Sequence, residues 1–401
     1  MTITRRNPLA FLDSQIYELR EKGLYRRLRV VETEQKSRCV IDGREVITLS
    51  SNNYLGLTTH PRLREAALQA VRDFGAGSGA VRTIAGTMSL HEQLEARLAE
   101  FKHVEAVLTF QSGFTCNTGV IPILALEGAL IVSDELNHAS IIDGIRLTKA
   151  EKKIFPHRDV DALRGILRDA RVASGGSDRT IVILTDGVFS MDGDIAPLPG
   201  IVEAAEEADA IVYVDDAHSS GVLGRNGRGS VDHFDLHGRV HVQVGTLSKA
   251  IGVLGGYVAG TSSLRTVLEH RARPFLFSTS HPPAVAAACL AAIDVLEAEP
   301  GLIDRLWENT RYFKAGLQRL GFNTGQSETP ITPVIIGSGA AAMKFSDALF
   351  DDGVFAMGIG FPTVPENLSR VRTIVTAEHS RAELDECLAA FDKVGREMAI
   401  I

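Results

Sequence analysis

Residues 241–250 read HVQVGTLSKA, and residues 251–260 read IGVLGGYVAG. A β-type run therefore ends just before Lys249, and a glycine-rich stretch without any charge follows it. Burying a lysine without a partner is costly, so Lys249 either extends to water or takes part in chemistry. In open α/β sheets, ligands bind beyond the carboxyl ends of the strands, which is where this lysine stands.

Working outward, the run at 240–248 is one of six short apolar runs. The others are residues 106–112, 129–135, 180–188, 210–217 and 255–261. Several are continuously apolar, as strands buried on both faces must be, and helical stretches such as 159–173 and 198–210 alternate with them. The pattern predicts an α/β fold with a mostly parallel sheet.

The flanking regions predict a division into three parts. Residues 1–50 read as an amphipathic helix and a hairpin with Asp42-Gly43 at its turn. Residues 51–290 form the large domain. Residues 291–401 begin with long helices and continue strand, helix, strand, helix, which predicts a smaller C-terminal α/β domain.

Bulk composition excludes several classes of protein. The chain has 401 residues and a net charge of -8, from 42 basic and 50 acidic residues, which argues against nucleic acid as the main partner. The most apolar run is broken by Pro122 and Glu127, and no signal peptide is recognisable, so we expect no membrane association and a cytoplasmic location. The four cysteines lack a C-x-x-C pair and read as free thiols: Cys39, Cys116, Cys289 and Cys387.

Polar residues close five of the predicted runs and favour one shared site: Ser112, Asp134, Asp186, Asp215 and Lys249. A buried Asp215 needs a partner, which could be a metal, an arginine or a protonated heteroaromatic nitrogen. His138 and His218 could supply two metal ligands, but further ligands at suitable spacing are not evident, so we expect no metal.

A phosphate site is predicted where the run at 106–112 ends. Ser112-Gly113-Phe114 opens a predicted helix, and helix N-termini with glycine and hydroxyl groups bind phosphate. Thr246 and Ser248 offer further hydroxyls beside Lys249. A phosphate site, a carboxylate, a lysine and His138 together describe a pocket for pyridoxal 5'-phosphate, which needs a lysine amine and an acidic partner for its ring nitrogen.

The sequence resembles the α-oxoamine synthases, which are pyridoxal-phosphate enzymes of fold type I. The matching stretches run from residue 50 to about residue 376: SSNNYLGL (50–57), GAGSGAVRTIAGT (75–87), DELNHASIIDGIRL (134–147), TDGVFSMDGDIAPL (185–198), VDDAHSSGVLGRNGRGS (214–230), GTLSKA (245–250), RPFLFSTSHPP (273–283) and FPTVP (361–365).

The resemblance implies specific roles for residues around the cofactor. Lys249 carries the cofactor as a Schiff base, Asp215 pairs with the ring nitrogen, His138 stacks on the ring, and His218 contacts the ring hydroxyl. Ser190 lies beside the cofactor, although its hydroxyl could equally serve a turn. Gly113 and Phe114, together with Ser112, Thr246 and Ser248, hold the phosphate.

Other implied roles concern the partner subunit and the substrate. Ser278 and Thr279 reach the phosphate of the other subunit in a homodimer whose active sites lie at the subunit interface. Arg372 binds the substrate carboxylate with help from Asn52. Arg370 could take that place instead, and Asn52 could simply cap a turn. Arg26 could meet the acyl substrate or lie at the solvated edge of a helix.

The implied activity is condensation of glycine with an acyl-CoA. The stretches at 137–144 and 185–196 are most similar to glycine C-acetyltransferase, so the expected product is 2-amino-3-oxobutanoate from acetyl-CoA. The alternative is 8-amino-7-oxononanoate synthesis, for biotin, from a pimeloyl thioester, alone or as a dual activity. A pyridoxal-phosphate aminotransferase is an alternative from another class.

Overall fold

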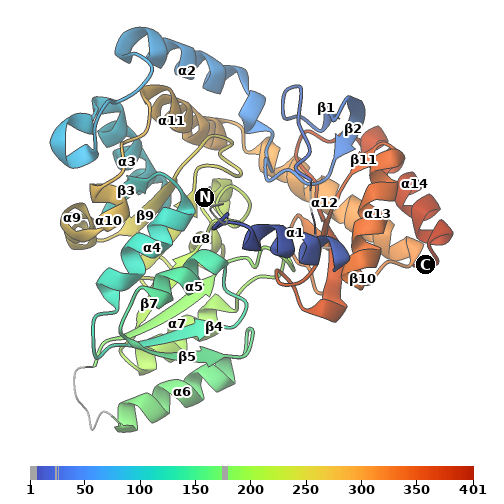
Figure 1. Ribbon diagram of the computed structural model, residues 1–401. Coiled ribbons are helices and arrows are strands. Elements are labelled where there is room, and N and C mark those ends of the chain that lie inside the picture. The colour runs from blue at the N-terminus through green and yellow to red at the C-terminus, as the bar shows by residue number, and fades with distance from the viewer. Residues whose placement is uncertain (1–6, 23–24, 26, 174–178) are drawn as a thin grey trace, which may run out of the picture.

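The computed structural model describes residues 7–22, 25, 27–173 and 179–401. Its centre is a seven-stranded sheet with the order β3-β9-β8-β7-β6-β4-β5 (Figure 1). The strands are β3 (Ala106–Phe110), β4 (Leu130–Asp134), β5 (Glu151–Phe155), β6 (Ile181–Asp186), β7 (Ile211–Asp215), β8 (Val242–Thr246) and β9 (Gly256–Gly260). Strand β9 runs in the opposite direction to the other six strands, which all run the same way. The predicted mostly parallel sheet is therefore confirmed.

Helices cover both faces of this sheet, as continuously apolar strands require. Successive strand residues face opposite ways, so Val182 and Ile183 join two different cores. One core lies under α6 (Val160–Ala173) and α7 (Leu198–Glu207). The other lies under α4 (Gly113–Leu124), α5 (Ala139–Arg146), α9 (Ser262–Arg271) and α10 (Arg273–Leu276).

Strand β5 is the strand that the apolar runs missed. Its sequence, EKKIF, places charges at three of five positions, and four of its five residues are exposed. It pairs only with β4, at the edge of the sheet. Charged side chains are usual on edge strands because they discourage pairing with other chains, so an apolar pattern cannot reveal such a strand.

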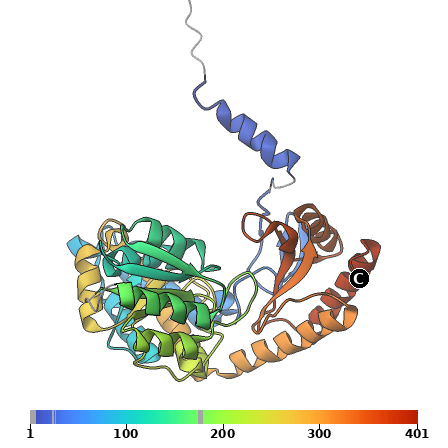
Figure 2. The ribbon, with the colours of Figure 1, turned by 90° about the horizontal axis from the view of Figure 1, so that it is seen from below.

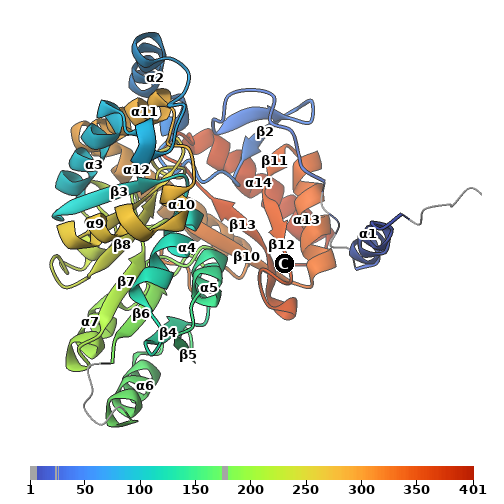
Figure 3. The same ribbon diagram turned by 60° about the vertical axis from the view of Figure 1, so that its left-hand side comes forward.

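The C-terminal part contains β10 (Ile331–Gly337), β11 (Val354–Phe355), β12 (Met357–Ile359) and β13 (Ser369–Ile374). The antiparallel sheet β10-β13-β12 packs against α12 (Gly301–Leu320), α13 (Gly339–Asp351) and α14 (Arg381–Glu397). Figure 3 shows these strands between the large sheet and α13. The predicted smaller α/β unit is therefore present.

The N-terminal elements are α1 (Phe11–Glu21) and the hairpin of β1 (Arg38–Ile41) and β2 (Arg44–Thr48). Helix α1 buries none of its residues and stands clear of the remaining chain (Figure 2). Strand β2 pairs with β11, which favours counting the hairpin with the C-terminal part. The domain boundaries at residues 50 and 290 stay predictions.

The remaining elements connect these parts. They are η1 (Leu57–Thr59), α2 (Pro61–Phe74), η2 (Arg82–Gly86), α3 (Ser89–Lys102), η3 (Arg225–Gly227), α8 (Ser230–His233), α11 (Pro283–Ala298) and η4 (Glu366–Leu368). Within the described residues, none of the helices is long and apolar enough to cross a membrane.

A half-buried histidine joins the end of β4 to the loop after β6. His157 Nδ1 lies 3.0 Å from Asp134 Oδ1, and its Nε2 lies 2.6 Å from Asp194 Oδ2. Burial disfavours the charged ring, but the two carboxylates outweigh that effect and raise the pKa of His157 to about 9. The cationic ring therefore bridges two loops that border the carboxyl ends of the strands.

This bridge predicts a pH dependence of stability. Because the folded pKa is raised from 6.5 to about 9, the stabilisation is complete below pH 6.5 and is lost as the pH rises through 9. We expect the free energy of unfolding to fall across that window by about 1 kcal/mol per pH unit, and to fall less in His157→Gln. Urea unfolding at fixed protein concentration measures it. The exposed His233→Gln is the control, and equal pH slopes in all three proteins would contradict the assignment.

Candidate active site

A cavity of about 210 Å³ opens where strands of the large sheet end. It brings together ten of the residues predicted from the sequence: Ser112, Gly113, Phe114, His138, Ser190, Asp215, His218, Thr246, Ser248 and Lys249. Ser140, Asp186 and Ala217 complete the lining. The lining residues follow β3, β4, β6, β7 and β8. Four of the five residues expected to share a site at strand ends line this cavity, but Asp134 does not. Its carboxylate instead contacts the His157 ring and accepts from the Arg158 backbone.

Asp215 lies at the end of β7 and is 3 % exposed. Its Oδ2 accepts a hydrogen bond of 2.6 Å from Asn117 Nδ2, and its Oδ1 accepts one of 2.9 Å from the backbone of Ala217. Asn117, on α4, in turn accepts from the Tyr213 hydroxyl at 2.5 Å. Among the described residues Asp215 forms no ion pair. A buried carboxylate held this way suits a cationic ring nitrogen entering the cavity.

Lys249 lines the same cavity as Asp215. It forms no ion pair or hydrogen bond among the described residues. Burial lowers the pKa of its amine to about 8; the charges of Asp215 and Asp186 oppose this shift, and that of Arg372 adds to it. Near neutral pH a larger fraction of this amine is therefore neutral than of an ordinary lysine, and the neutral form is the one that acts as a nucleophile or a base.

His138 is fixed by contacts that the sequence did not predict. Its backbone N–H donates to Asp186 Oδ2 at 2.7 Å, and its Nδ1 lies 2.7 Å from the Ser140 hydroxyl. Burial, together with the negative charge of Asp215, raises the pKa of Asp186 well above its usual value. Asp186 was among the strand-end residues but was given no role. Its place opposite Asp215 in the register of β6 and β7 is the signal that would have included it.

His218 lines the cavity and contacts Tyr54, a residue that was given no role from the sequence. The Tyr54 hydroxyl and His218 Nδ1 lie 2.7 Å apart, and the two rings meet edge-on. Burial, followed by the charges of Lys249 and Arg372, lowers the pKa of His218 well below its usual value, so the ring is neutral and one of its nitrogens carries a proton to donate. Tyr54 lies in the quoted stretch at 50–57, but a lone tyrosine carries no distinctive spacing.

The N-terminus of α4 faces the cavity, as the predicted phosphate site requires. Ser112 caps the helix by accepting from the Thr115 backbone at 3.1 Å. A Cβ at Gly113 would lie 2.5 Å from Thr246 Cγ2, so only glycine lets the helix start so close to the end of β8. The first backbone N–H groups of a helix have no partner within it and attract anions.

Arg372 and Asn52 lie side by side outside the cavity lining. Arg372 donates to the Ser190 carbonyl at 2.6 Å and to Asn52 Oδ1 at 3.4 Å. Arg370 instead pairs with Asp192 and is 2 % exposed. The guanidinium that is available beside the cavity is therefore that of Arg372, which favours Arg372 over Arg370 as the carboxylate-binding residue.

Two more predicted residues, Ser278 and Thr279, do not line this cavity. Their role in another subunit stays a prediction. Arg26 lies outside the described residues, so its predicted role stays a prediction. In the described part of the chain, no group of three or more histidine, cysteine, aspartate or glutamate side chains is placed to hold a metal ion.

Comparisons with known proteins place the chain in a family. The model of the class I and II aminotransferases matches residues 44–391. The 8-amino-7-oxononanoate synthase of Symbiobacterium thermophilum is 64 % identical, over 98 % of this chain and 99 % of that protein. The 8-amino-7-oxononanoate synthase 1 of Bacillus subtilis is 55 % identical, over 98 % of each chain. These relatives do not support the expectation of a glycine C-acetyltransferase. They are named for the alternative activity, 8-amino-7-oxononanoate synthesis.

Solved structures agree with the predicted fold and cofactor. The serine palmitoyltransferase of S. paucimobilis, solved with a bound pyridoxal-phosphate–myriocin aldimine, has a TM-score of 0.92 at 31 % identity over 99 % of this chain and 100 % of that chain. An 8-amino-7-oxononanoate synthase from Francisella tularensis has a TM-score of 0.74 at 26 % identity, over 89 % of this chain and 99 % of that chain. The chain therefore belongs to the class I and II aminotransferase family and, among its pyridoxal-phosphate enzymes of fold type I, to the α-oxoamine synthases.

Proposed function

We propose that the chain is a pyridoxal-phosphate-dependent 8-amino-7-oxononanoate synthase, acting on an amino acid and a pimeloyl thioester. The observation that carries this proposal is the 64 % identity, over nearly the whole of both chains, to a relative of that name. The cavity supports it, because the lysine, the carboxylate and the helix N-terminus that such chemistry needs all face one space.

The product's carbon skeleton identifies the amino acid. In 8-amino-7-oxononanoate, carbons 1 to 7 have the length of a pimeloyl group with its free carboxylate, and carbon 7 is the former thioester carbonyl. Carbons 8 and 9 are then an amino-bearing carbon and a methyl group. Alanine supplies both if its carboxylate leaves as CO₂, whereas glycine would supply one carbon too few. We therefore replace the predicted glycine by alanine: alanine and the thioester give the product, CO₂ and the free thiol.

The residues of the cavity fit pyridoxal 5'-phosphate. Asp215 is a buried carboxylate without a cation, Lys249 is an amine with a pKa of about 8, and the start of α4 offers unpaired N–H groups. When bound, the cofactor supplies an electron-accepting ring that is covalently joined to an amine.

Each of these residues then has a defined task. Asp215 keeps a proton on the cofactor's ring nitrogen, and the Asn117 and Ala217 donors hold Asp215 in the charged form. Lys249 would hold the cofactor, and its amine, when free, is placed to act as the base for the α-proton. His138 would pack against the cofactor ring, and the neutral His218, oriented by Tyr54, would donate to the ring hydroxyl.

The carboxylate and phosphate ends are held by different parts of the chain. Arg372 and Asn52 orient the alanine carboxylate from the C-terminal part and the segment before η1. Ser112, Gly113, Phe114, Thr246 and Ser248 bind the phosphate. Ser278 and Thr279 complete that phosphate site in the other subunit of a homodimer.

A substrate test separates the candidates. We expect free thiol and CO₂ in equal amounts from alanine with a pimeloyl thioester, and a kcat/KM for alanine about tenfold or more above that for glycine, because one methyl group contributes roughly 1–3 kcal/mol in an apolar pocket. Faster thiol release from glycine with acetyl-CoA would restore the acetyltransferase. Conversion of added keto acids without thiol release would indicate an aminotransferase.

Lys249 is tested by fixing the cofactor with borohydride, which makes a cofactor–lysine bond permanent. We expect the wild type to carry the label on the peptide containing Lys249 and Lys249→Ala to carry none. Lys314→Gln is the matched control, because Lys314 also has a pKa lowered by burial to about 8 but hydrogen-bonds to Ser327 and Thr329, away from the cavity. A label that persists in Lys249→Ala would overturn the assignment, as measured by peptide mass spectrometry.

A further inference from the structure

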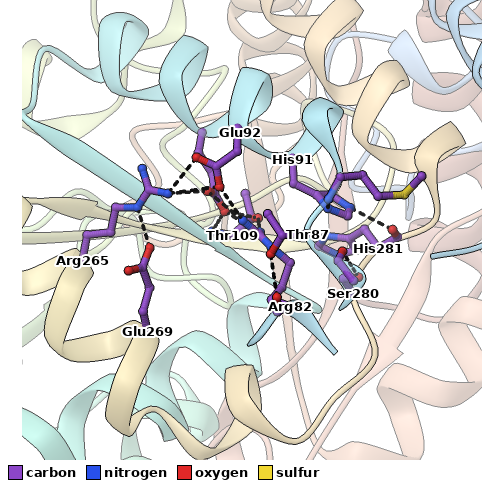
Figure 4. Close-up of polar contacts among 12 residues, drawn as sticks. Arg82, Thr87, His91, Glu92, Thr109, Arg265, Glu269, Ser280 and His281 are labelled. Atoms are coloured by element: carbon purple, nitrogen blue, oxygen red, sulfur yellow. Dashed lines mark hydrogen bonds and ion pairs between the residues drawn. The ribbon is translucent and has the colours of Figure 1, made fainter. Parts of the chain in front are cut away.

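A network of charged side chains joins η2, α3, β3 and α9 (Figure 4), and none of its members lines the cavity of Lys249. Arg82, in η2, forms two parallel hydrogen bonds with Glu95 of α3, at 2.7 and 3.1 Å, and the Glu95 side chain is fully buried. Glu95 also accepts from the backbone and hydroxyl of Thr109 in β3. Arg265 of α9 joins the network through Glu92, Glu95 and Glu269. We call these side chains the Arg82 network.

The Arg82 network contributes little to the stability of the fold, but it fixes the position of η2. Removing two charges from water costs about as much as their attraction returns, so a buried ion pair is weak evidence for stability. The bidentate Arg82–Glu95 geometry, anchored to the backbone of the edge strand β3, instead fixes where η2 lies.

Segment 80–87, which contains η2, is hydrogen-bonded to residues 279 and 280. The Ser280 hydroxyl donates to the carbonyls of Ala80 and Gly86, at 3.1 and 2.6 Å, and Val81 bridges Thr279. A Cβ at Gly86 would lie 2.1 Å from the Ala80 carbonyl oxygen, so the packing of this segment leaves no room for a side chain at residue 86. Arg82 itself holds Thr87, through its Nε at 3.0 Å. Because of these contacts, the position of Arg82 determines where residues 279 and 280 lie.

The hydroxyls of Ser278 and Thr279 have no hydrogen-bond partner among the described residues. They do not line their own chain's cavity, and Thr279 is exposed. Beside them Phe277 is 71 % exposed and Ile84 is 83 % exposed. Phe277 also lines an apolar groove with Leu126 and Leu147. Apolar surface of this kind marks a protein interface, which places the two free hydroxyls where a second copy would lie.

We propose that the Arg82 network positions Ser278 and Thr279 for the cofactor phosphate of the partner subunit, so that Arg82 of one chain determines cofactor affinity at the other chain's Lys249. This inference rests on the proposed function, including its homodimer. Arg82 is a positioning residue: it acts through Ser280 and the 279–280 backbone and does not touch the cofactor.

Hybrid dimers test the direction of this effect. In the first hybrid, one chain carries Lys249→Ala and the other Arg82→Met, so the surviving lysine is served by an unaltered Ser278–Thr279 segment. In the second, a wild-type chain pairs with a chain carrying both changes, so the surviving lysine is served by the altered segment. Both hybrids contain the same substitutions, and any loss of stability is common to them.

The measurement is the cofactor concentration that gives half-maximal borohydride fixation at the one remaining Lys249. We expect the second hybrid to need roughly tenfold more cofactor than the first, as loss of one or two hydrogen bonds to a charged phosphate implies. Equal values, or a weaker first hybrid, would overturn the proposal. Arg265→Lys, which alters the same network without touching segment 80–87, should show no difference between hybrids, and Arg82→Lys replaces Arg82→Met if that chain does not fold.

Thr279→Val, placed in the same two hybrids, tests separately whether Thr279 contacts the cofactor phosphate of the partner subunit, which the role of the Arg82 network presupposes. A difference with Thr279→Val but none with Arg82→Met would overturn the role of the Arg82 network while keeping the partner's phosphate contact. Absence of both differences would overturn the contact across the interface and the network together. A wild type without any label at Lys249 would instead contradict the proposed function itself.

Discussion

The active site depends on one constraint, which is that the Asp215 carboxylate is buried at the end of a central strand without a cation from the described residues. Asn117 and the Ala217 backbone donate to its oxygens, and Tyr213 holds Asn117 in place, so the charge is tolerated but remains available. Its field also reaches its neighbours: it raises the pKa of Asp186 and opposes the lowering of the pKa of Lys249. In the proposed function, the cationic ring of a bound cofactor would complete this arrangement.

The site joins two parts of the chain. The large sheet supplies the strand ends around the cofactor, while Arg372 on β13 reaches the carbonyl of Ser190 in the loop after β6. That loop is also held by Arg370 through Asp192 and by His157 through Asp194. In the proposed function, contacts between the two parts would therefore align the substrate carboxylate with the cofactor, and rearrangement of this loop would separate them. The proposed role of the Arg82 network extends the same principle to a second subunit.

The sequence predicted the central sheet and most of the cavity because these follow local rules. Apolar runs that end in Ser112, Asp215 and Lys249 are visible without a structure. Strand β5 was missed because an edge strand carries charges, and Asn117 and Tyr54 because their roles come from contacts 98 and 164 residues away in the chain. The preference for glycine and acetyl-CoA came from short stretches around His138 and Ser190 that also resemble the 8-amino-7-oxononanoate synthases, so these stretches do not identify the substrates.

Exchange of the alanine α-hydrogen in D₂O, without thioester, tests the role of Asp215 most directly. The cofactor-loaded wild type should exchange this hydrogen rapidly. Asp215→Asn, which keeps the shape but loses the charge, should still bind the cofactor yet exchange about a hundredfold or more slowly, the size expected when a preorganised electrostatic group is removed. Proton NMR follows the exchange, and bound cofactor is counted by absorbance in the same sample. Exchange at the wild-type rate in an Asp215→Asn protein with full cofactor would contradict the account.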